Sequence, residues 1–358
     1  MIYDFITIWG GAAWLFANIN LPFNCKKLIL ERNSLLGIKV LMSWWERANF
    51  TNLNLLPEKY VSNNPKAVIG FLNRFTQYDI INFFESNWVD WKVEDNFRVI
   101  TASGHARDIV NVLINKSKQN NVEISLNTLV KDVIFKDNLY KIITSKGNYL
   151  AKNVIIAVWW RSYPQTWTTG FGYELAKKLG LKVNKPYKWL VWIVTKEKVN
   201  EFAWTTLNVK FLLFENGKEI FNDINSLLFT HWWISGIVTY NSVLYGKDLD
   251  TFPENYLIKI EFLEENWRIL ATKKLRKLFN LSLENNFIYL HPIGLKSWKE
   301  AKVTAWGVDT NELTKYLESK KYPGLFFIWE VVDITWHTWW YNLQWAWSSA
   351  YCMAQKFN

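Results

Sequence analysis

Gly10, Gly11 and Glu31 have the residue types and the spacing that a nucleotide site requires. The two glycines follow an apolar run, and Glu31 comes 20 residues after Gly11. Backbone N–H groups at a glycine turn that opens a helix can bind a pyrophosphate, here with the amides of Ala12 and Ala13. A carboxylate at the position of Glu31 can accept hydrogen bonds from ribose hydroxyl groups. The pattern therefore predicts a dinucleotide at this turn.

This chemistry requires a strand–helix–strand unit, and the sequence predicts one. Residues 2–8 and 26–31 have the composition of buried strands, and 11–20 that of the helix between them. The remaining α/β elements are expected as helices at 105–119, 172–180 and 342–355, hairpin strands within 122–158 that end in an apolar strand at 154–158, and a buried strand at 323–328. We therefore expect an α/β fold with a parallel sheet.

The middle of the chain has a different pattern. Short aromatic strands are predicted at 189–240, and a charged helix at 253–280, where apolar residues recur at three- and four-residue spacing. Both ends of the chain keep the α/β pattern. We therefore expect a discontinuous cofactor domain, 1–185 and 300–358, with an inserted β-rich and helical substrate domain, 186–299.

Composition argues against several classes of protein. The chain has 358 residues, a formal net charge of +10 and two cysteines, Cys25 and Cys352. Two cysteines and four scattered histidines support neither a disulfide framework nor a metal site, so a reducing cytoplasm is the expected location. The lysines are dispersed apart from KKLRK at 273–277, which favours a solvated surface over a nucleic-acid-binding face. No stretch has the about 20 apolar residues that a membrane span needs.

Tryptophan is the anomaly of this composition. The chain has 23 Trp and 15 Gly, whereas glycine makes up roughly 7% of an average protein. The tryptophans gather at predicted turns and strand ends, where glycine supplies positive φ or close backbone approach and an indole does not. The segments are TIWGGAAWLFAN (7–18), MSWWERANFTN (42–52), IIAVWWRSYPQTWTTGFGY (155–173), THWWISG (230–236), TAWGVD (304–309) and FIWEVVDITWHTWWYNLQ (327–344).

With glycine in place of these tryptophans, the chain resembles the FAD-binding flavoprotein family that includes aminoacetone oxidase-like enzymes and a bile-acid 3-dehydro-Δ4,6-reductase. The resemblance covers nearly the whole length and rests on the ordered motifs together. It implies a Rossmann-type, GR2-like FAD-binding domain and FAD as the cofactor. The positions with tryptophan for the family's glycine are Trp9, Trp14, Trp44, Trp45, Trp159, Trp160, Trp167, Trp233, Trp306, Trp329, Trp336, Trp339 and Trp340, with Trp88, Trp189, Trp192 and Trp204 as further cases.

A single cause can explain why tryptophan replaces the family's glycine at all of these positions. The codon UGA specifies glycine in some bacterial genetic codes and tryptophan in others, and it differs from the glycine codon GGA by one base. We hypothesise that the gene uses UGA for glycine at these seventeen positions. The codon UGG is then expected at Trp91, Trp267, Trp298, Trp345 and Trp347. A protein that is truly rich in tryptophan and a deliberately altered chain remain as alternatives.

The resemblance also implies which residues hold the cofactor. The expected cofactor-binding positions are Trp9, Gly10, Gly11, Ala12, Ala13, Trp14, Glu31, Arg47, Asn49, Trp159, Trp160, Trp329, Glu330, Trp340, Tyr341, Asn342 and Leu343, with Asn52, Asp333 and Gln344 beside them. Glu330 follows the last buried strand, where related flavoproteins place an acid near the ribityl chain. Asn342 starts a helix whose positive end can stabilise an anionic flavin. The alternatives are a surface carboxylate for Glu31, turn chemistry for Arg47 and Asn49, and a helix N-cap for Asn342.

The leading interpretation is a FAD-dependent oxidoreductase that passes hydride between a small organic substrate and NAD(P)H or oxygen. No catalytic acid or base is predicted, because the flavin performs the hydride transfer. If the tryptophans are real, the alternative is a cofactor-free scaffold or binding protein on the same fold. A nucleic-acid binder is a third interpretation. It is disfavoured because the tryptophans lie at turns rather than along one basic face. Neither a nucleic-acid partner nor a membrane is expected.

Overall fold

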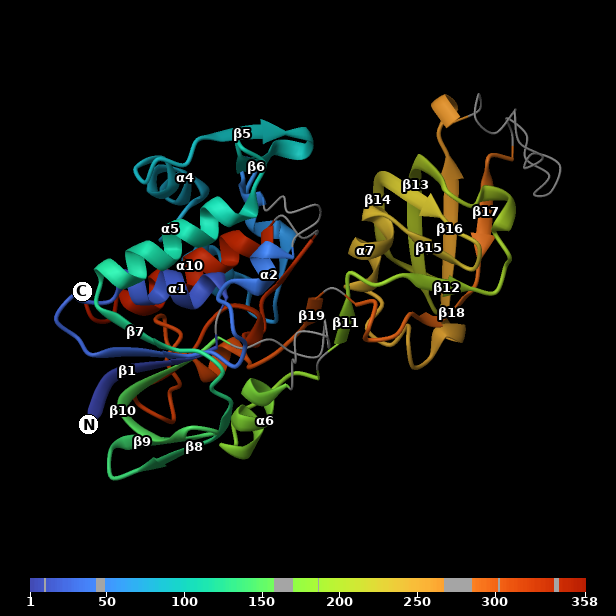
Figure 1. Ribbon diagram of the computed structural model, residues 1–358. Helices are drawn as coiled ribbons and strands as arrows, with labels where there is room; N and C mark the ends of the chain where they lie inside the picture. The colour runs from blue at the N-terminus through green and yellow to red at the C-terminus, as the bar shows by residue number, and fades with distance from the viewer. Residues whose placement is uncertain are drawn as a thin grey trace. The chain divides into compact units, whose positions relative to one another are not determined.

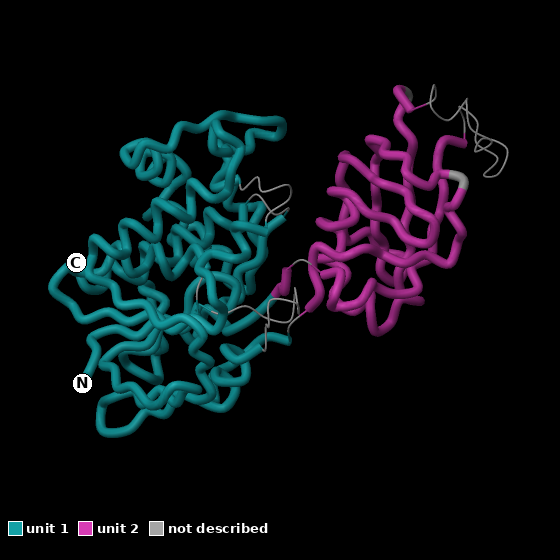
Figure 2. Tube along the Cα trace, in the orientation of Figure 1, with its two compact units in different colours: residues 1–160, 168–186, 306–358 teal, residues 161–167, 187–305 magenta. Residues whose placement is uncertain are grey.

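Two compact units make up the chain (Figure 2). Unit 1 comprises Met1–Trp160, Thr168–Pro186 and Trp306–Asn358, and unit 2 comprises Arg161–Trp167 and Tyr187–Ala305. Unit 1 is therefore built from both ends of the chain and unit 2 from its middle. The computed structural model describes residues 1–358 except 10, 43–48, 158–169, 186, 267–284, 302 and 338–340.

Unit 1 is organised around a seven-stranded sheet with a parallel core. The strands follow the order β7-β2-β1-β10-β9-β8, and β20 also pairs with β10. Their bounds are β1 (Ile2–Ile8), β2 (Lys27–Leu30), β7 (Val122–Ser125), β8 (Val130–Lys136), β9 (Leu139–Thr144), β10 (Gly147–Ile156) and β20 (Leu325–Phe327). The pairs of β1 with β2, β1 with β10, β2 with β7 and β10 with β20 are parallel. The predicted Rossmann-type α/β fold is confirmed.

Three helices lie side by side against this sheet (Figure 1). They are α1 (Ala12–Asn20), α5 (Ala106–Gln119) and α10 (Asn342–Ala354), and α1 contacts both others. In α5 the buried residues Ile109, Val110 and Leu113 recur at helical spacing, which is why the sequence pattern predicted it. Nearly all of α1 and α10 is buried, as their apolar compositions require. Among the described residues, no helix is long and apolar enough to cross a membrane.

Smaller elements surround this core. They are α2 (Ile38–Leu41), α3 (Pro65–Leu72), α4 (Gln77–Glu85), α6 (Phe171–Lys178), a three-stranded sheet of β3 (Asn49–Asn52), β6 (Arg98–Thr101) and β5 (Trp91–Glu94), the pair β4 (Tyr60–Val61) and β21 (Thr335–Trp336), and the 3-10 turn η9 (Trp329–Val331). The turn η9 follows β20 directly, so it lies at the carboxyl end of the parallel strands. Ligands of open α/β sheets bind at that edge.

Unit 2 contains an antiparallel sheet of seven strands in the order β17-β16-β13-β14-β15-β12-β18. Its elements are β12 (Ile193–Thr195), β13 (Thr205–Glu215), β14 (Lys218–Phe229), β15 (Trp233–Ser235), β16 (Tyr256–Phe262), β17 (Phe287–Leu290), β18 (Pro292–Leu295), the pair β11 (Tyr187–Trp189) and β19 (Val303–Ala305), and the helix α7 (Ile237–Val243).

The helix predicted at 253–280 is wrong over its first part. Tyr256–Phe262 forms β16 and alternates between buried and half-buried residues. The segment YLIKIEF has apolar residues at every second position, and its long-range pairing with β13 selects the strand. The part of the predicted helix at 267–280 lies outside the described residues. The longest strands of this unit, β13 and β14, have 11 and 12 residues, so the strands are not all short as expected.

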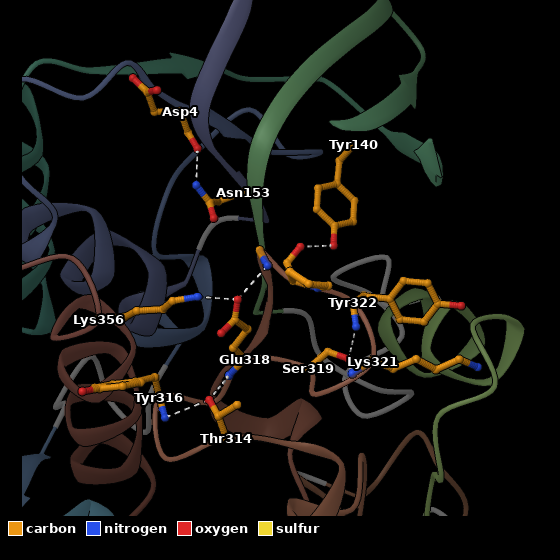
Figure 3. A network of polar contacts seen from close by, with 12 residues as sticks. Asp4, Tyr140, Asn153, Thr314, Tyr316, Glu318, Ser319, Lys321, Tyr322 and Lys356 are labelled. Atoms are coloured by element: carbon orange, nitrogen blue, oxygen red, sulfur yellow. Dashed lines mark hydrogen bonds and ion pairs between the residues drawn. The ribbon is translucent and has the colours of Figure 1, made fainter. Parts of the chain in front are cut away.

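A polar network fixes the turn that leads into β20 (Figure 3). Glu318 accepts a hydrogen bond of 2.7 Å from the backbone N–H of Gly324 and forms an ion pair with Lys356 near the C-terminus. The Tyr140 hydroxyl donates to the carbonyl of Pro323 at 2.7 Å. Gly324 has φ +81, and a Cβ there would lie 2.7 Å from the Lys152 carbonyl oxygen, so only glycine fits. This turn holds β20 in register with β10.

Candidate functional site

The predicted nucleotide turn lies between the end of β1 and the start of α1. Trp9 continues β1, and its N–H donates to the Leu30 carbonyl at 2.8 Å. Trp9 has φ 75, in the left-handed region, and Gly11 is the N-cap residue of α1. In the described part of the chain no side chain caps this helix, and its first turn has no acidic residue, so the chain's own groups do not neutralise its positive end. Gly10 lies outside the described residues.

Indole rings fill the space in front of this turn. A Cβ on Gly11 would lie 3.2 Å from Cζ3 of Trp329 and 3.4 Å from Nε1 of Trp14. Trp9, Trp14 and Trp329 are 8%, 0% and 1% exposed. The indole N–H groups of Trp9 and Trp14 are buried and have no hydrogen-bond partner in the described part of the chain. Buried donors of this kind are costly, so these two side chains fit their surroundings poorly.

Glu31 lies one residue beyond β2 and is buried. Its carboxylate accepts hydrogen bonds from the backbone N–H of Asn33 at 2.6 Å and from Asn33 Nδ2 at 2.8 Å. Burial raises the pKa of Glu31 to about 7, against the lowering effect of these donors. The alternative of an exposed surface carboxylate is therefore wrong. A buried carboxylate at the end of β2 is suited to accept hydrogen bonds from a ribose.

A second buried carboxylate, Glu330, lies in η9 at the carboxyl end of β20. It forms an ion pair with Lys39 of α2 and accepts a hydrogen bond of 3.2 Å from Asn342 Nδ2. Asn342 Oδ1 in turn accepts from Trp329 Nε1 at 2.6 Å. Lys39 Nζ lies 4.8 Å from the ring centroid of Trp329. Glu330 Oε2 has no hydrogen-bond partner in the described part of the chain, so this oxygen can accept another donor.

Lys39 is a residue of this site that the sequence did not predict. Burial lowers the pKa of its ammonium group, and the negative charge of Glu330 opposes this effect. The available signal was a single lysine within the apolar segment LLGIKVLM, 35–42. A lone charge in such a run must be exposed or paired, and here it is paired with a carboxylate nearly 300 residues further along the chain.

The start of α10 brings the next predicted residues together. Tyr341 is its N-cap residue, and its carbonyl accepts from the Tyr60 hydroxyl at 3.0 Å. Asn342 is the first helical residue and bonds Trp329 and Glu330, so the alternative that it caps the helix is wrong. Leu343 is half-buried in the same first turn. The positive end of α10 therefore lies beside the Glu330 carboxylate.

Some of the remaining predicted residues lie in the described part of the chain, and the others lie outside it. Asn49 begins β3, and its buried Nδ2 has no partner among the described residues. Asn52 forms a turn, because its Oδ1 accepts from the backbone N–H of Asn54 at 2.8 Å. Asp333 is buried and accepts from Asn184 Nδ2 at 2.6 Å. The predicted residues outside the described part of the chain are Gly10, Arg47, Trp159, Trp160 and Trp340.

Within the described residues, no group of three His, Cys, Asp or Glu side chains is placed to hold a metal ion.

The fold and the site define a class. A parallel sheet with α1 at its nucleotide turn, a buried acid after β2 and a second acid after β20 are the features of a Rossmann-type flavoprotein oxidoreductase. The chain belongs to the HI0933-like family, because the model of the HI0933-like protein Rossmann domain matches residues 3–356. It is therefore a member of a family of FAD-dependent oxidoreductases, as the sequence predicted.

Curated relatives match this chain over almost its whole length. Two proteins named ribosomal RNA dihydrouridine synthase, from Escherichia coli and Haemophilus influenzae, are 28% and 29% identical over 99% of this chain and 97% and 98% of their own lengths. The 3-dehydro-bile acid delta(4,6)-reductase of Clostridium scindens is 22% identical over 96% of both chains. The solved structure of a 3-ketosteroid-delta4-(5alpha)-dehydrogenase from Rhodococcus jostii has the same fold, with a TM-score of 0.55 and 10% identity over 99% of this chain and 96% of that one.

The residues as written do not fit FAD. A dinucleotide turn requires the backbone to approach the pyrophosphate closely, and glycine normally permits this. Here the indoles of Trp14 and Trp329 occupy the space against Gly11. The buried indole N–H groups of Trp9 and Trp14 have no hydrogen-bond acceptor among the described residues, so these two side chains are poorly accommodated at this turn. The fold is that of a flavoprotein, and the tryptophans close its nucleotide turn.

Proposed function

We propose that the protein, in a form that carries glycine at the nucleotide turn, is a FAD-dependent reductase of carbon–carbon double bonds conjugated with a carbonyl group. The names of the relatives support this reaction class. Dihydrouridine is uridine with two hydrogens added across C5 and C6, a bond conjugated with the C4 carbonyl. A Δ4,6 double-bond system in a 3-dehydro bile acid is likewise conjugated with a carbonyl. FAD, when bound and first reduced by an electron donor such as NAD(P)H, would supply the hydride for such a reduction.

The observation that carries the proposal is the full-length match to two relatives of one name. Each match spans 99% of this chain and at least 97% of the relative, so both units of the protein are included. The buried carboxylates support it too. Glu31 and Glu330 can accept hydrogen bonds from hydroxyl groups at the ends of β2 and β20, and Glu330 Oε2 has no partner in the described structure. Ribose and ribityl hydroxyls are suitable donors to such groups.

Uridine in ribosomal RNA is the first substrate to test. Two relatives carry that name, and their full-length matches outweigh the dispersed lysines, from which no nucleic-acid partner was expected. This substrate implies a cytoplasmic location, which the low cysteine content also favours. The second candidate is a small enone, which the sequence analysis expected and which the bile-acid reductase supports. NAD(P)H is the proposed electron donor in either case.

The cofactor is tested with two synthetic genes. One encodes the chain as written, and the other encodes glycine at all seventeen suspect positions. The glycine form is expected to purify yellow with one FAD per chain, and the chain as written to purify colourless. A colourless glycine form would overturn the flavoenzyme proposal and favour the cofactor-free scaffold.

The substrate is tested with the flavin-containing form. Bound FAD is first reduced with NADH or NADPH, and its reoxidation is followed after addition of unmodified ribosomal RNA or of a 3-oxo-Δ4,6 steroid. Mass spectrometry of the digested RNA detects the two added hydrogens of dihydrouridine. Reduction of RNA alone supports the first candidate, and reduction of the steroid alone supports the second. Reoxidation by oxygen only would overturn both.

A further inference from the structure

Five tryptophans have a backbone conformation that bulky residues rarely adopt. Trp9, Trp88, Trp204, Trp306 and Trp329 have φ of 75, 63, 63, 69 and 64. For a large L-residue a φ in this range is an outlier, whereas glycine adopts it freely. Among the described Phe and Tyr residues only Phe97 has a positive φ, so aromatic side chains as such do not explain the pattern.

The helix ends of α4 and α6 allow a direct comparison. After α6, the N–H of Leu181 donates to the Ala176 carbonyl and the N–H of Gly180 donates to the Lys177 carbonyl. After α4, the N–H of Val89 donates to the Phe84 carbonyl and the N–H of Trp88 donates to the Glu85 carbonyl. Both are Schellman motifs, in which the residue after the C-cap is left-handed and usually glycine. Trp88 therefore stands where α6 has Gly180.

Packing does not explain the conformation of the two exposed members of this group. Trp88 is 96% exposed and Trp204 is 72% exposed. A strained backbone persists only where surrounding structure enforces it, and neither side chain has such surroundings. The turns themselves thus require the left-handed conformation, whichever residue stands there.

The three buried members lie near the proposed cofactor site. Trp9 follows the last residue of β1, two positions before Gly11, and Trp329 opens η9, with its ring in the space against Gly11. Trp306 is 7% exposed, and its carbonyl accepts from the Tyr173 hydroxyl, which also donates to the Glu330 carbonyl. Trp9 and Trp329 thus use the left-handed backbone at the carboxyl ends of β1 and β20, the edge where ligands of such sheets bind, and Trp306 is linked to Glu330 of that edge through Tyr173.

Other tryptophans have the surroundings of true indoles. Trp345 and Trp347 lie within α10, and each is completely buried. Trp345 Nε1 donates to the Trp329 carbonyl at 3.1 Å, and Trp347 Nε1 donates to the Phe50 carbonyl at 2.8 Å. Their donors are satisfied and their backbone is helical. Both are among the tryptophans expected to have the codon UGG, whereas all five left-handed tryptophans are among the seventeen expected glycine positions.

We infer that glycine, specified by UGA codons, occupies positions 9, 88, 204, 306 and 329 of the protein that the organism makes. This inference rests on backbone conformation and does not depend on the proposed substrate. It also extends beyond the cofactor site, because Trp88 and Trp204 lie on the surface. A purely functional explanation, in which tryptophan replaced glycine to close a nucleotide turn, would leave these two positions unexplained.

The coding DNA and the native protein test the inference. We expect TGA at all five positions and TGG at the codons for Trp345 and Trp347. Peptide mass spectrometry of the protein purified from its own source should show glycine at the five positions. TGG at any of the five, or tryptophan in the native peptides, would overturn the inference. Neither readout involves flavin or activity, so the outcome is separate from that of the proposed function.

Discussion

The turns at the two ends of β20 both contain a residue with a left-handed backbone, which is glycine at one end and tryptophan at the other. At its start, Gly324 has φ +81 and lies where a Cβ would meet the Lys152 carbonyl oxygen at 2.7 Å. At its end, Trp329 has φ 64 and carries a buried indole. Both ends contain a buried carboxylate, Glu318 and Glu330, paired with a lysine. The strand is three residues long, so the two turns share one local framework.

The difference between the ends concerns what fills the turn. At the start, Glu318 binds the N–H of Gly324, and the turn is complete within the chain. At the other end, the Trp329 ring lies against Gly11, beside buried indole donors that have no partner in the described residues. In a structural turn the chain's own groups satisfy the buried donors and acceptors, whereas in a turn that binds a cofactor some of them are satisfied only by the ligand. In the proposed cofactor turn, the indoles of Trp14 and Trp329 occupy part of the space that such a ligand would need.

The largest expected effect comes from position 329. A chain with glycine at sixteen of the seventeen suspect positions, which keeps Trp329, should bind FAD at least about 1,000-fold more weakly than the chain with all seventeen, a difference of about 4 kcal/mol. The reason is that this ring lies in the space before Gly11. Flavin fluorescence titration measures the two dissociation constants.

A matched control keeps Trp88 instead. That side chain is on the surface, so its retention should leave FAD affinity unchanged. Equal affinity for the chains that keep Trp329 and Trp88 would show that the two ends of β20 do not differ as argued.

The ion pairs at the two ends should differ next. Lys39→Met leaves the carboxylate of Glu330, whose side chain is 0% exposed, without its cation, and should lower the free energy of unfolding by about 3–4 kcal/mol. Lys356→Met acts on Glu318, whose side chain is 10% exposed and which keeps the Gly324 N–H, and should cost about 1 kcal/mol. Urea unfolding monitored by circular dichroism gives both values. A larger loss for Lys356→Met would reverse the ranking of the two ends.

Glu31, at the cofactor side, should make stability depend on pH. Its pKa is about 7 in the folded chain and 4.5 as a free side chain, so the folded state holds the proton where the unfolded state releases it. Stability therefore falls as pH rises from about 4.5 to 7. Glu31→Gln removes this loss and should be more stable than the parent chain by about 3 kcal/mol at pH 8, with little difference near pH 5. Urea unfolding at both pH values measures this, and a difference independent of pH would contradict it.

Gly324 should tolerate a methyl group less well than another left-handed glycine. Gly324→Ala adds a Cβ against the Lys152 carbonyl oxygen, while Gly217, with φ +79, has nothing within 4 Å of the same position. We expect a loss of about 1 kcal/mol for Gly217→Ala, from backbone strain alone, and about 2 kcal/mol for Gly324→Ala. Thermal unfolding compares them, and equal losses would remove the close approach as a cause.

Local patterns were sufficient to predict the central strands and helices of unit 1, but not its smaller elements between residues 38 and 101, such as α3 and α4. The strand Ile2–Ile8, the helix Ala106–Gln119 and the strand Leu325–Phe327 follow from apolar runs and helical spacing. The strand Tyr256–Phe262 was predicted as a helix because a charged segment with three- and four-residue spacing follows it. Its true conformation depends on pairing with β13, a partner more than 40 residues away. Such long-range pairing is not encoded in a local window.

The site was predictable where the residues follow strands. Glu31 and Glu330 both lie at strand ends; spacing located Glu31, and the family resemblance located Glu330. Lys39 was missed because its role depends on Glu330, which a single sequence does not connect with it. The tryptophans were identified by their turns, yet the sequence did not separate those that need a left-handed backbone from the rest. The φ angles make that distinction for the described residues.

The smallest expected effect is at the surface, where it measures the stability cost of a left-handed backbone without a contribution from side-chain packing. Trp88→Gly and Trp204→Gly relieve a left-handed tryptophan that is mostly exposed, so each should raise the free energy of unfolding by about 1 kcal/mol and Tm by about 2 °C. Trp232→Gly is the matched control, because Trp232 is 59% exposed and its φ is not positive. At position 232 glycine relieves no left-handed backbone. It only increases the conformational entropy of the unfolded chain, so this substitution should lower stability. Differential scanning calorimetry distinguishes the signs. A loss of stability at Trp88 and Trp204 equal to that at Trp232 would mean that these turns do not favour glycine, and the cofactor turn would then stand as the only argument for it.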